Sequence, residues 1–307
     1  MDYVLRTFDL CKRYKNQLAL NQACLNIERG DIYGFVGENG SGKTTIIRTV
    51  TGLIFADSGS YEIFGVPSDS PEIISARKKV GAIVESPSIY LNMTAMENLL
   101  TQCGILGISD KAKAEAALFE VGLGELSDSK KKAGNFSLGM RQRLGIAMAL
   151  LGDPEFIILD EPMNGLDPAG IVEIRELILK LNQERGITFL ISSHILTELA
   201  LVATKYGIIS KGRVIREITA EELKRECRRI TTIRADKPEE LWEILSELFA
   251  EEDLRRTQSG ATVLGEVSLN QLLSKIIDAD IQILSIVCTE ASIEDFYLSV
   301  VGGAHHG

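Results

Sequence analysis

Four short runs of the chain are apolar with little alternation of polar positions: Ile32–Val36, Phe156–Asp160, Ile187–Ser192 and Tyr206–Ser210. Such runs are typical of strands that are buried on both faces of a parallel sheet. Segments with helical periodicity lie between them. Because strands alternate with helices, we expect an α/β sheet whose parallel strands are joined by right-handed crossovers.

Capping patterns predict where several helices begin and end. Thr94 and Glu97 have the spacing of a capping box, and Ser137 is a natural N-cap for the next helical segment. Asp167 is placed to cap a long helix that Gly186 would end. The region of buried strands therefore also contains several separate helices.

The two ends of the chain have different patterns. From Tyr3 to about Gly65 the pattern predicts strands with one helix inserted. The composition shifts near Thr219, and beyond it we predict strand, helix, two strands, helix and strand, which is the order of a ferredoxin-like unit. We therefore predict two domains, 1–218 and 219–307. The second contains no catalytic constellation, so we expect a small α+β accessory domain with a regulatory or dimer-supporting role.

Composition and charge narrow the classes of function. The chain has 307 residues, a formal net charge of −10 and a pI near 5.0. This acidic balance argues against a surface that coats nucleic acid, so no nucleic-acid partner is expected. The five cysteines are scattered without a C-x-x-C pair, which indicates reduced thiols. No apolar run reaches the roughly 18 residues of a membrane-spanning helix, so another chain would have to supply any span.

The stretch GENGSGKT fits the phosphate-binding loop pattern G-x-x-x-x-G-K-[ST]. Its glycines let backbone N–H groups point inward, and the N-terminus of the following helix adds a positive partial charge. Lys43 would reach the β- and γ-phosphates, and the Thr44 hydroxyl would be a ligand for Mg²⁺. A chance glycine-rich turn is the alternative, which the flanking strand and helix disfavour. The nucleotide-binding residues predicted in this segment are Gly37, Glu38, Asn39, Gly40, Ser41, Gly42, Lys43, Thr44 and Thr45.

Two adjacent carboxylates, Asp160 and Glu161, follow a predicted buried strand. Beside a phosphate loop, Asp160 is placed to hold magnesium and Glu161 to orient or deprotonate the attacking water. Both could instead be solvated acids at a strand end, which is the weaker interpretation for two neighbouring acids at a buried sheet. A lone histidine such as His194 is usually packed or exposed. Its place just past another strand of the same sheet nevertheless predicts that it lies near the γ-phosphate.

Five motifs in a fixed order resemble those of the nucleotide-binding subunit of ABC transporters. They are GENGSGKT, NFSLGMRQR, IILDEP, NGLD and ISSH, and the resemblance covers roughly the first 215 residues. It implies a P-loop NTPase domain of the ABC ATPase type that binds ATP and Mg²⁺. This domain would have a mixed sheet, antiparallel strands at the N-terminus and a helical subdomain at about 86–152.

The same resemblance assigns roles to four further residues. Tyr14 would stack on adenine, although a partly exposed strand tyrosine is the alternative. Ser137 and Gly139 would close on the γ-phosphate of a nucleotide held by a second subunit, and Asp167 would link the two sites. The resemblance thus implies a head-to-tail dimer with a second copy or a paralogous ATP-binding subunit. It also implies a separate polytopic membrane permease that holds the protein, otherwise cytoplasmic, on the inner face of the cell membrane.

Two departures from the family motifs narrow the group further. Leu138 and Met140 replace the residues that are usual in the signature motif, while Ser137 and Gly139 remain. Glu85 stands where the family usually has glutamine, in contact with magnesium and the attacking water. We assign it to both metal binding and catalysis and expect Lys43 nearby. A glutamate within IVESPSIYLNMTAMENL is similar to the group that exports bacitracin and lantibiotic peptides.

We therefore expect an ATP-hydrolysing subunit that powers a bacterial exporter of peptide antibiotics. One alternative is a soluble ABC-type ATPase acting on ribosomes or DNA. Those relatives usually carry two ATPase domains or a long coiled-coil insertion, and the phosphate loop occurs once here. A second alternative is export of lipid, polysaccharide or small drugs, since the substrate would contact the membrane chain.

Overall fold

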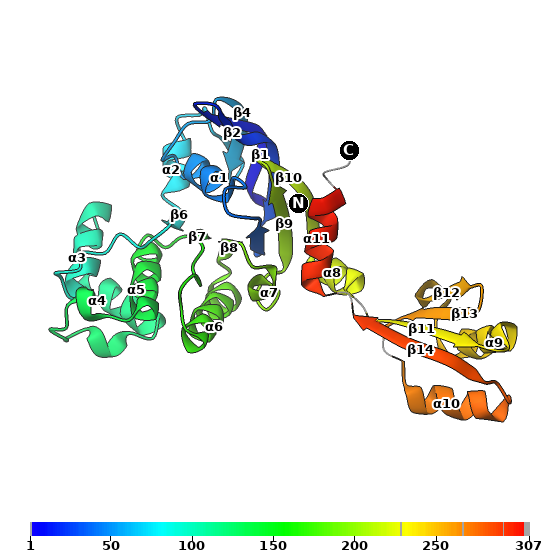
Figure 1. Ribbon diagram of the computed structural model, residues 1–307. Coiled ribbons are helices and arrows are strands. Elements are labelled where there is room, and N and C mark those ends of the chain that lie inside the picture. Colours follow the sequence, from blue (N-terminus) through cyan, green and yellow to red (C-terminus); the bar gives the residue numbers. More distant parts are fainter. Residues whose placement is uncertain (1, 228, 266, 291, 304–307) are drawn as a thin grey trace. The chain divides into compact units, whose positions relative to one another are not determined.

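The computed structural model (Figure 1) describes residues 2–227, 229–265, 267–290 and 292–303. The chain divides into two compact units, Met1–Ala220 and Glu221–Gly307. In the part of the chain described, no helix is both long enough and apolar enough to cross a membrane. All five cysteines are free.

A six-stranded sheet forms the centre of the first unit. Its strands are β3 (Ile32–Val36), β6 (Val80–Ile83), β7 (Phe156–Asp160), β8 (Thr188–Ser193), β9 (Lys205–Ser210) and β10 (Arg213–Thr219). They lie in the order β10-β9-β3-β8-β7-β6, and all pairs are parallel except β10 with β9. Every residue of β3, β7 and β8 is buried, which explains their unbroken apolar runs.

A second, antiparallel sheet is built from strands in the first 67 residues. It contains β1 (Tyr3–Tyr14), β2 (Gln17–Glu28), β4 (Ser58–Ile63) and β5 (Val66–Pro67) in the order β2-β1-β4-β5. Helix α1 (Lys43–Val50) contributes Ile46 and Ile47 to one core cluster that also holds Leu10 of β1 and Phe156 of β7. The core therefore joins α1 to both sheets and fixes the start of this helix beside the strand ends.

The other helices of the first unit are α2 (Ile73–Arg77), α3 (Ala95–Leu106), α4 (Lys111–Glu120), α5 (Leu138–Leu150), α6 (Pro168–Arg185) and α7 (Leu196–Leu199). Helices α3, α4 and α5 form a group beyond β6 (Figure 1). The predicted caps are confirmed: Thr94 and Glu97 form a capping box, Ser137 and Asp167 cap α5 and α6, and Gly186 ends α6 in the left-handed conformation. The mixed sheet and the N-terminal antiparallel sheet confirm the predicted fold class.

The second unit contains a four-stranded antiparallel sheet. Its elements are α8 (Ala220–Glu226), β11 (Arg229–Ala235), α9 (Pro238–Leu248), β12 (Leu254–Thr257), β13 (Gly260–Leu264), α10 (Leu269–Asp278), β14 (Ile283–Glu290) and α11 (Ile293–Gly303). The order is β12-β13-β11-β14, with the first strand beside the third. Ile233 of β11, Leu241 of α9 and Leu272 of α10 share one core, as expected for a ferredoxin-like unit.

Candidate nucleotide site

The loop between β3 and α1 requires glycine at two points. Gly40 and Gly42 have φ angles of 80° and 116°, in the region that side-chain-bearing residues avoid. A Cβ on Gly42 would lie 2.7 Å from the Ala19 carbonyl oxygen, so a larger residue does not fit. The loop thereby leads the backbone tightly into the N-terminus of α1, where anions bind.

Lys43 lies over this loop with its ammonium group held by oxygens. Its Nζ donates to the carbonyl oxygens of Gly37 at 2.6 Å and Glu38 at 3.2 Å. The same Nζ is 3.3 Å from Glu161 Oε1, and the Lys43 side chain is only 5% exposed. A buried ammonium needs such partners, and phosphate oxygens could take their place.

Asp160 is a buried carboxylate at the end of β7 that two hydroxyls approach. The Thr44 hydroxyl donates to its Oδ2 at 2.9 Å, and the Ser192 hydroxyl donates to its Oδ1 at 2.6 Å. Because β8 pairs with β7, Ser192 lies opposite Asp160 on the neighbouring strand and reaches its carboxylate. The structure thus brings Thr44 and Asp160 together, as the sequence predicts.

Thr44 and Asp160 have the chemistry of a magnesium site. Mg²⁺ takes hard oxygen ligands and is commonly held by one or two carboxylates together with substrate phosphates. Both side chains present oxygens at the start of α1, next to the loop that is shaped for phosphate. The residues present therefore fit this ion.

Glu161 connects the loop lysine to His194. Its Oε1 faces Lys43 Nζ, and its Oε2 is 2.8 Å from Nδ1 of His194. The backbone N–H of Glu161 donates to the Ser192 hydroxyl at 2.8 Å, and its φ of 52° is in the left-handed region. The strand end therefore aims this carboxylate toward the loop at the expense of backbone strain.

A groove of about 280 Å³ brings Tyr14 to the same place. Its lining residues are Tyr14, Gln17, Ala19, Asn39, Gly40, Gly42, Lys43, Thr44, Thr45 and Glu161. The Tyr14 ring is 42% exposed, and Lys12 Nζ lies 5.9 Å from its centroid. An aromatic face at one end and the phosphate loop at the other are suited to a nucleotide. Ser41, which is also in the loop, has a buried hydroxyl without a hydrogen-bond partner.

Glu85 takes part in an ion pair that the sequence did not predict. We expected Lys43 nearby, whereas Oε1 of Glu85 pairs with Nη2 of Arg48 at 2.6 Å and its side chain is 61% exposed. Lys43 instead faces Glu161. The reason is local: the backbone turns at Glu85, with φ of 63°, and directs the carboxylate onto the side of α1.

Ser137, Gly139 and Asp167 lie close to one another. Among the residues that the structure describes, none of the three contacts the phosphate loop of the same chain. Ser137 Oγ accepts the Met140 N–H, and Asp167 Oδ1 accepts the Gly170 N–H. A Cβ on Gly139 would lie 3.8 Å from Leu166, which precedes Asp167. The N-termini of α5 and α6 are therefore neighbours, and Ser137 at this end is exposed.

Sequence reasoning missed two residues of this region. Ser192 touches both Asp160 and the backbone of Glu161, and Arg48 holds Glu85. A signal for the first was available, because a hydroxyl inside a strand with every residue buried needs a partner. The partner of Arg48 could not be read from the sequence.

The glycine loop that joins a buried parallel strand to a helix, with a buried aspartate two strands away, defines the class of P-loop nucleoside triphosphatases. The family model described as ABC transporter matches residues 20–164. Two curated relatives are bacitracin transport ATP-binding protein BcrA of Bacillus licheniformis and lantibiotic transport ATP-binding protein SrtF of Streptococcus pyogenes. BcrA is 41% identical over 100% of both chains. SrtF is 41% identical over 70% of this chain and 90% of its own length.

The chain belongs to the ATP-binding proteins of ABC transporters, whose ATP hydrolysis is coupled to transport. The family predicted from the five motifs is thereby confirmed. Among solved structures, the ATP-binding cassette MJ0796 in a dimeric, post-hydrolysis state bound to ADP and Pi is similar. Its TM-score is 0.62 with 26% identity, over 70% of this chain and 98% of that one.

Proposed function

We propose that this protein powers the export of peptide antibiotics of the bacitracin or lantibiotic kind, as a means of resistance or self-protection. The observation that carries the proposal is the identity to BcrA, a bacitracin transport protein. It extends over the whole of both chains and so includes the second unit. SrtF, named for lantibiotic transport, supports the same class of cargo.

In the proposed mechanism, the loop from Gly37 to Thr45 binds the nucleotide phosphates and Tyr14 stacks on the base. Lys43 exchanges Glu161 and the loop carbonyls for phosphate oxygens. Thr44, Asp160 and, after a change of partner, Glu85 would hold Mg²⁺, which neutralises phosphate charge when bound. Oxygen-rich surroundings at Thr44 and Asp160 support this assignment.

Glu161 then acts as the general base toward the attacking water, and His194 orients it. Release of Lys43 to the phosphates would free Oε1 of Glu161, while the bond from His194 to Oε2 keeps the carboxylate in place. Positioned general-base catalysis contributes about 10²–10⁴-fold to a rate. Glu161→Gln should therefore retain ATP binding and lose most hydrolysis.

A second subunit completes each site in this proposal. Ser137 and Gly139 are exposed or half-buried at the N-terminus of α5, and a helix N-terminus attracts the γ-phosphate of a nucleotide bound across the interface. Asp167 beside them would connect the two sites. Hydrolysis would then require the interface to close.

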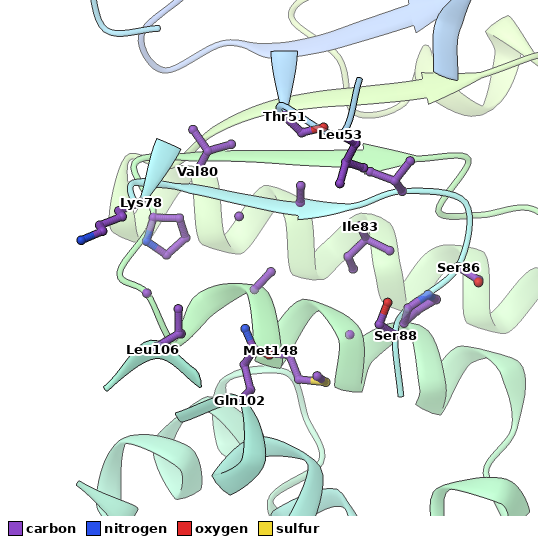
Figure 2. Close-up of a pocket in the computed structure, with 18 residues that line it drawn as sticks. Thr51, Leu53, Lys78, Val80, Ile83, Ser86, Ser88, Gln102, Leu106 and Met148 are labelled. Atoms are coloured by element: carbon purple, nitrogen blue, oxygen red, sulfur yellow. The ribbon is translucent and has the colours of Figure 1, made fainter. Parts of the chain in front are cut away.

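The membrane partner is proposed to dock at a pocket of about 500 Å³ below β6 (Figure 2). Figure 2 shows Val80 and Ile83 on the strand above the pocket and Met148 and Gln102 on helices below it. Ser86, in the segment after Glu85, also lines the pocket. A permease segment seated here would contact the chain next to Glu85 and hold the protein at the inner face of the membrane.

Resistance assays test the cargo. The protein would be expressed with its neighbouring polytopic membrane protein in a sensitive bacterium, and growth inhibition by bacitracin, a lantibiotic, a lipid-directed drug and a small dye would be compared. We expect higher tolerance of the peptide antibiotics but not of the other compounds. This tolerance should be lost when the protein carries Glu161→Gln. Protection only against the dye or the lipid-directed drug would contradict the peptide assignment.

A further inference from the structure

Arg48 and Glu85 form an ion pair on the side of α1 that faces the segment after β6. Nη2 and Oε1 are 2.6 Å apart, and the side chains are 38% and 61% exposed. We propose that Arg48 is a positioning residue that holds Glu85 away from the metal–nucleotide complex and releases it when that complex binds. This inference rests on the proposed role of Glu85 as a metal ligand.

The helix geometry explains why Arg48 can do this. Thr44 and Arg48 are four residues apart on α1, so they share a face with about 5–6 Å between their Cβ atoms. Thr44 bonds Asp160 and marks the proposed metal site. A carboxylate bound to Arg48 is therefore held about one helical turn from that site, within reach of a side-chain rearrangement.

The backbone at Glu85 is strained. The Ser86 N–H donates to the Val84 carbonyl at 2.8 Å, which closes a three-residue turn centred on Glu85. With φ of 63° at its centre, this is the rarer and more strained form of the γ-turn. Strained backbone positions cluster at active sites and switch regions, which agrees with a residue that exchanges partners.

A glutamate at position 85 allows Arg48 and Mg²⁺ to compete for the same carboxylate. A carboxylate pairs with a guanidinium through a charge-assisted bond, and the same oxygens are ligands for Mg²⁺. A neutral glutamine side chain would bind Arg48 more weakly. Because the pair is largely exposed, it shifts an equilibrium by only about two- to fivefold, so Arg48 restrains Glu85 without preventing its release.

The test measures metal dependence of binding, not turnover. Full-length protein carrying Glu161→Gln would be titrated with Mg²⁺ at fixed ATP, and the Mg²⁺ concentration for half-maximal nucleotide binding would be determined by fluorescence or calorimetry. Arg48→Ala should lower that concentration by about two- to fivefold. Arg48→Lys, which keeps the charge, should restore most of the parent value.

A double-mutant cycle isolates the pair. Arg48→Ala is repeated in the Glu85→Gln background, where we expect most of its effect on the half-maximal Mg²⁺ concentration to disappear. The measured quantity is the ratio of the shift with Glu85 to the shift with glutamine at this position. Arg6→Ala, which breaks the partly buried Arg6–Glu62 pair of the antiparallel sheet, is the control and should shift neither background.

Two results would overturn the inference, and they are distinguishable. Equal shifts with and without Glu85, or no shift at all, would show that Arg48 does not act through Glu85 while the metal site stands. If nucleotide binding by the parent is independent of Mg²⁺, or if Asp160→Asn leaves its Mg²⁺ dependence unchanged, the proposed metal site fails as well.

Discussion

The Ser192 hydroxyl connects the two acidic residues of the nucleotide site. It donates to Asp160 Oδ1 at 2.6 Å and accepts the Glu161 N–H at 2.8 Å, and the side chain is fully buried. One small side chain thereby fixes both the orientation of the buried carboxylate and the strained backbone of its neighbour.

Ser192→Ala should therefore weaken both stability and hydrolysis. Removing the hydroxyl leaves a buried carboxylate oxygen and a backbone N–H without their partner, at a cost of about 1–3 kcal/mol in the free energy of unfolding. Urea unfolding and steady-state ATPase measurements would record the two effects. Ser193→Ala, next along β8 but bonded to Glu198 rather than Asp160, is the control and should affect hydrolysis less; equal effects would argue against this role.

Mixed dimers test the assignment of Ser137 to the partner's site. Lys43→Ala and Ser137→Arg chains should each be inactive alone, because every site of either homodimer contains a defect. Combined in equal amounts, they should recover roughly a quarter of normal ATPase activity, since half the dimers carry one intact site of two in a head-to-tail arrangement. Two Lys43→Ala preparations mixed together provide the background. No recovery would indicate that Ser137 serves its own chain.

A chain ended after Ala220 tests the second unit. The first unit has its own core and contains the whole nucleotide groove, so it should fold and bind ATP with unchanged affinity. We expect weaker dimerisation or loss of antibiotic tolerance, which analytical ultracentrifugation and growth assays would measure. Unchanged dimerisation and transport would contradict a regulatory or dimer-supporting role.

Alkaline pH should destabilise the first unit through Tyr33. Complete burial, reinforced by the Glu217 carboxylate that accepts its O–H at 2.6 Å, raises the pKa of Tyr33 well above its usual value. Above about pH 10 the unfolded chain loses this proton while the folded chain keeps it. The folded state then binds more protons, so the free energy of unfolding falls as pH rises.

The measurement is urea unfolding from about pH 9 to pH 11, across the ordinary tyrosine pKa. Tyr33→Phe should show a smaller decline than the parent. Tyr206→Phe is a useful comparison, because burial raises the pKa of Tyr206 to about 12 and gives an effect of the same sign. A decline that is unchanged in Tyr33→Phe would exclude this tyrosine as the cause.

The sequence predicted those parts of the molecule that local patterns determine. Glycines and Lys43 at fixed spacing predicted the loop, and unbroken apolar runs predicted the strands of the sheet. Ser137 and Asp167 predicted where two helices begin, because both are favoured N-cap residues. These features depend on neighbours within a few residues. Because five such motifs occur in a fixed order, their resemblance to known motifs also predicted the family.

The partners of the charged side chains depend on distant segments and could not be predicted in this way. Arg48 and Glu85 are 37 positions apart and meet only because the strand before Glu85 lies in the same unit as α1. Ser192 reaches Asp160 because β8 pairs with β7 in one particular register. Lys43 likewise pairs with a carboxylate that was not predicted for it, Glu161, which comes from a different strand end.

The left-handed backbone at Glu85 and Glu161 has a consequence for directed evolution. Each position costs about 1–3 kcal/mol relative to a relaxed backbone, and glycine would adopt either φ angle without that cost. A laboratory selection for heat resistance alone would therefore tend to enrich glycine at these two positions. Selected proteins would survive heating but lack both carboxylates, so such a selection should be paired with a screen for ATP turnover.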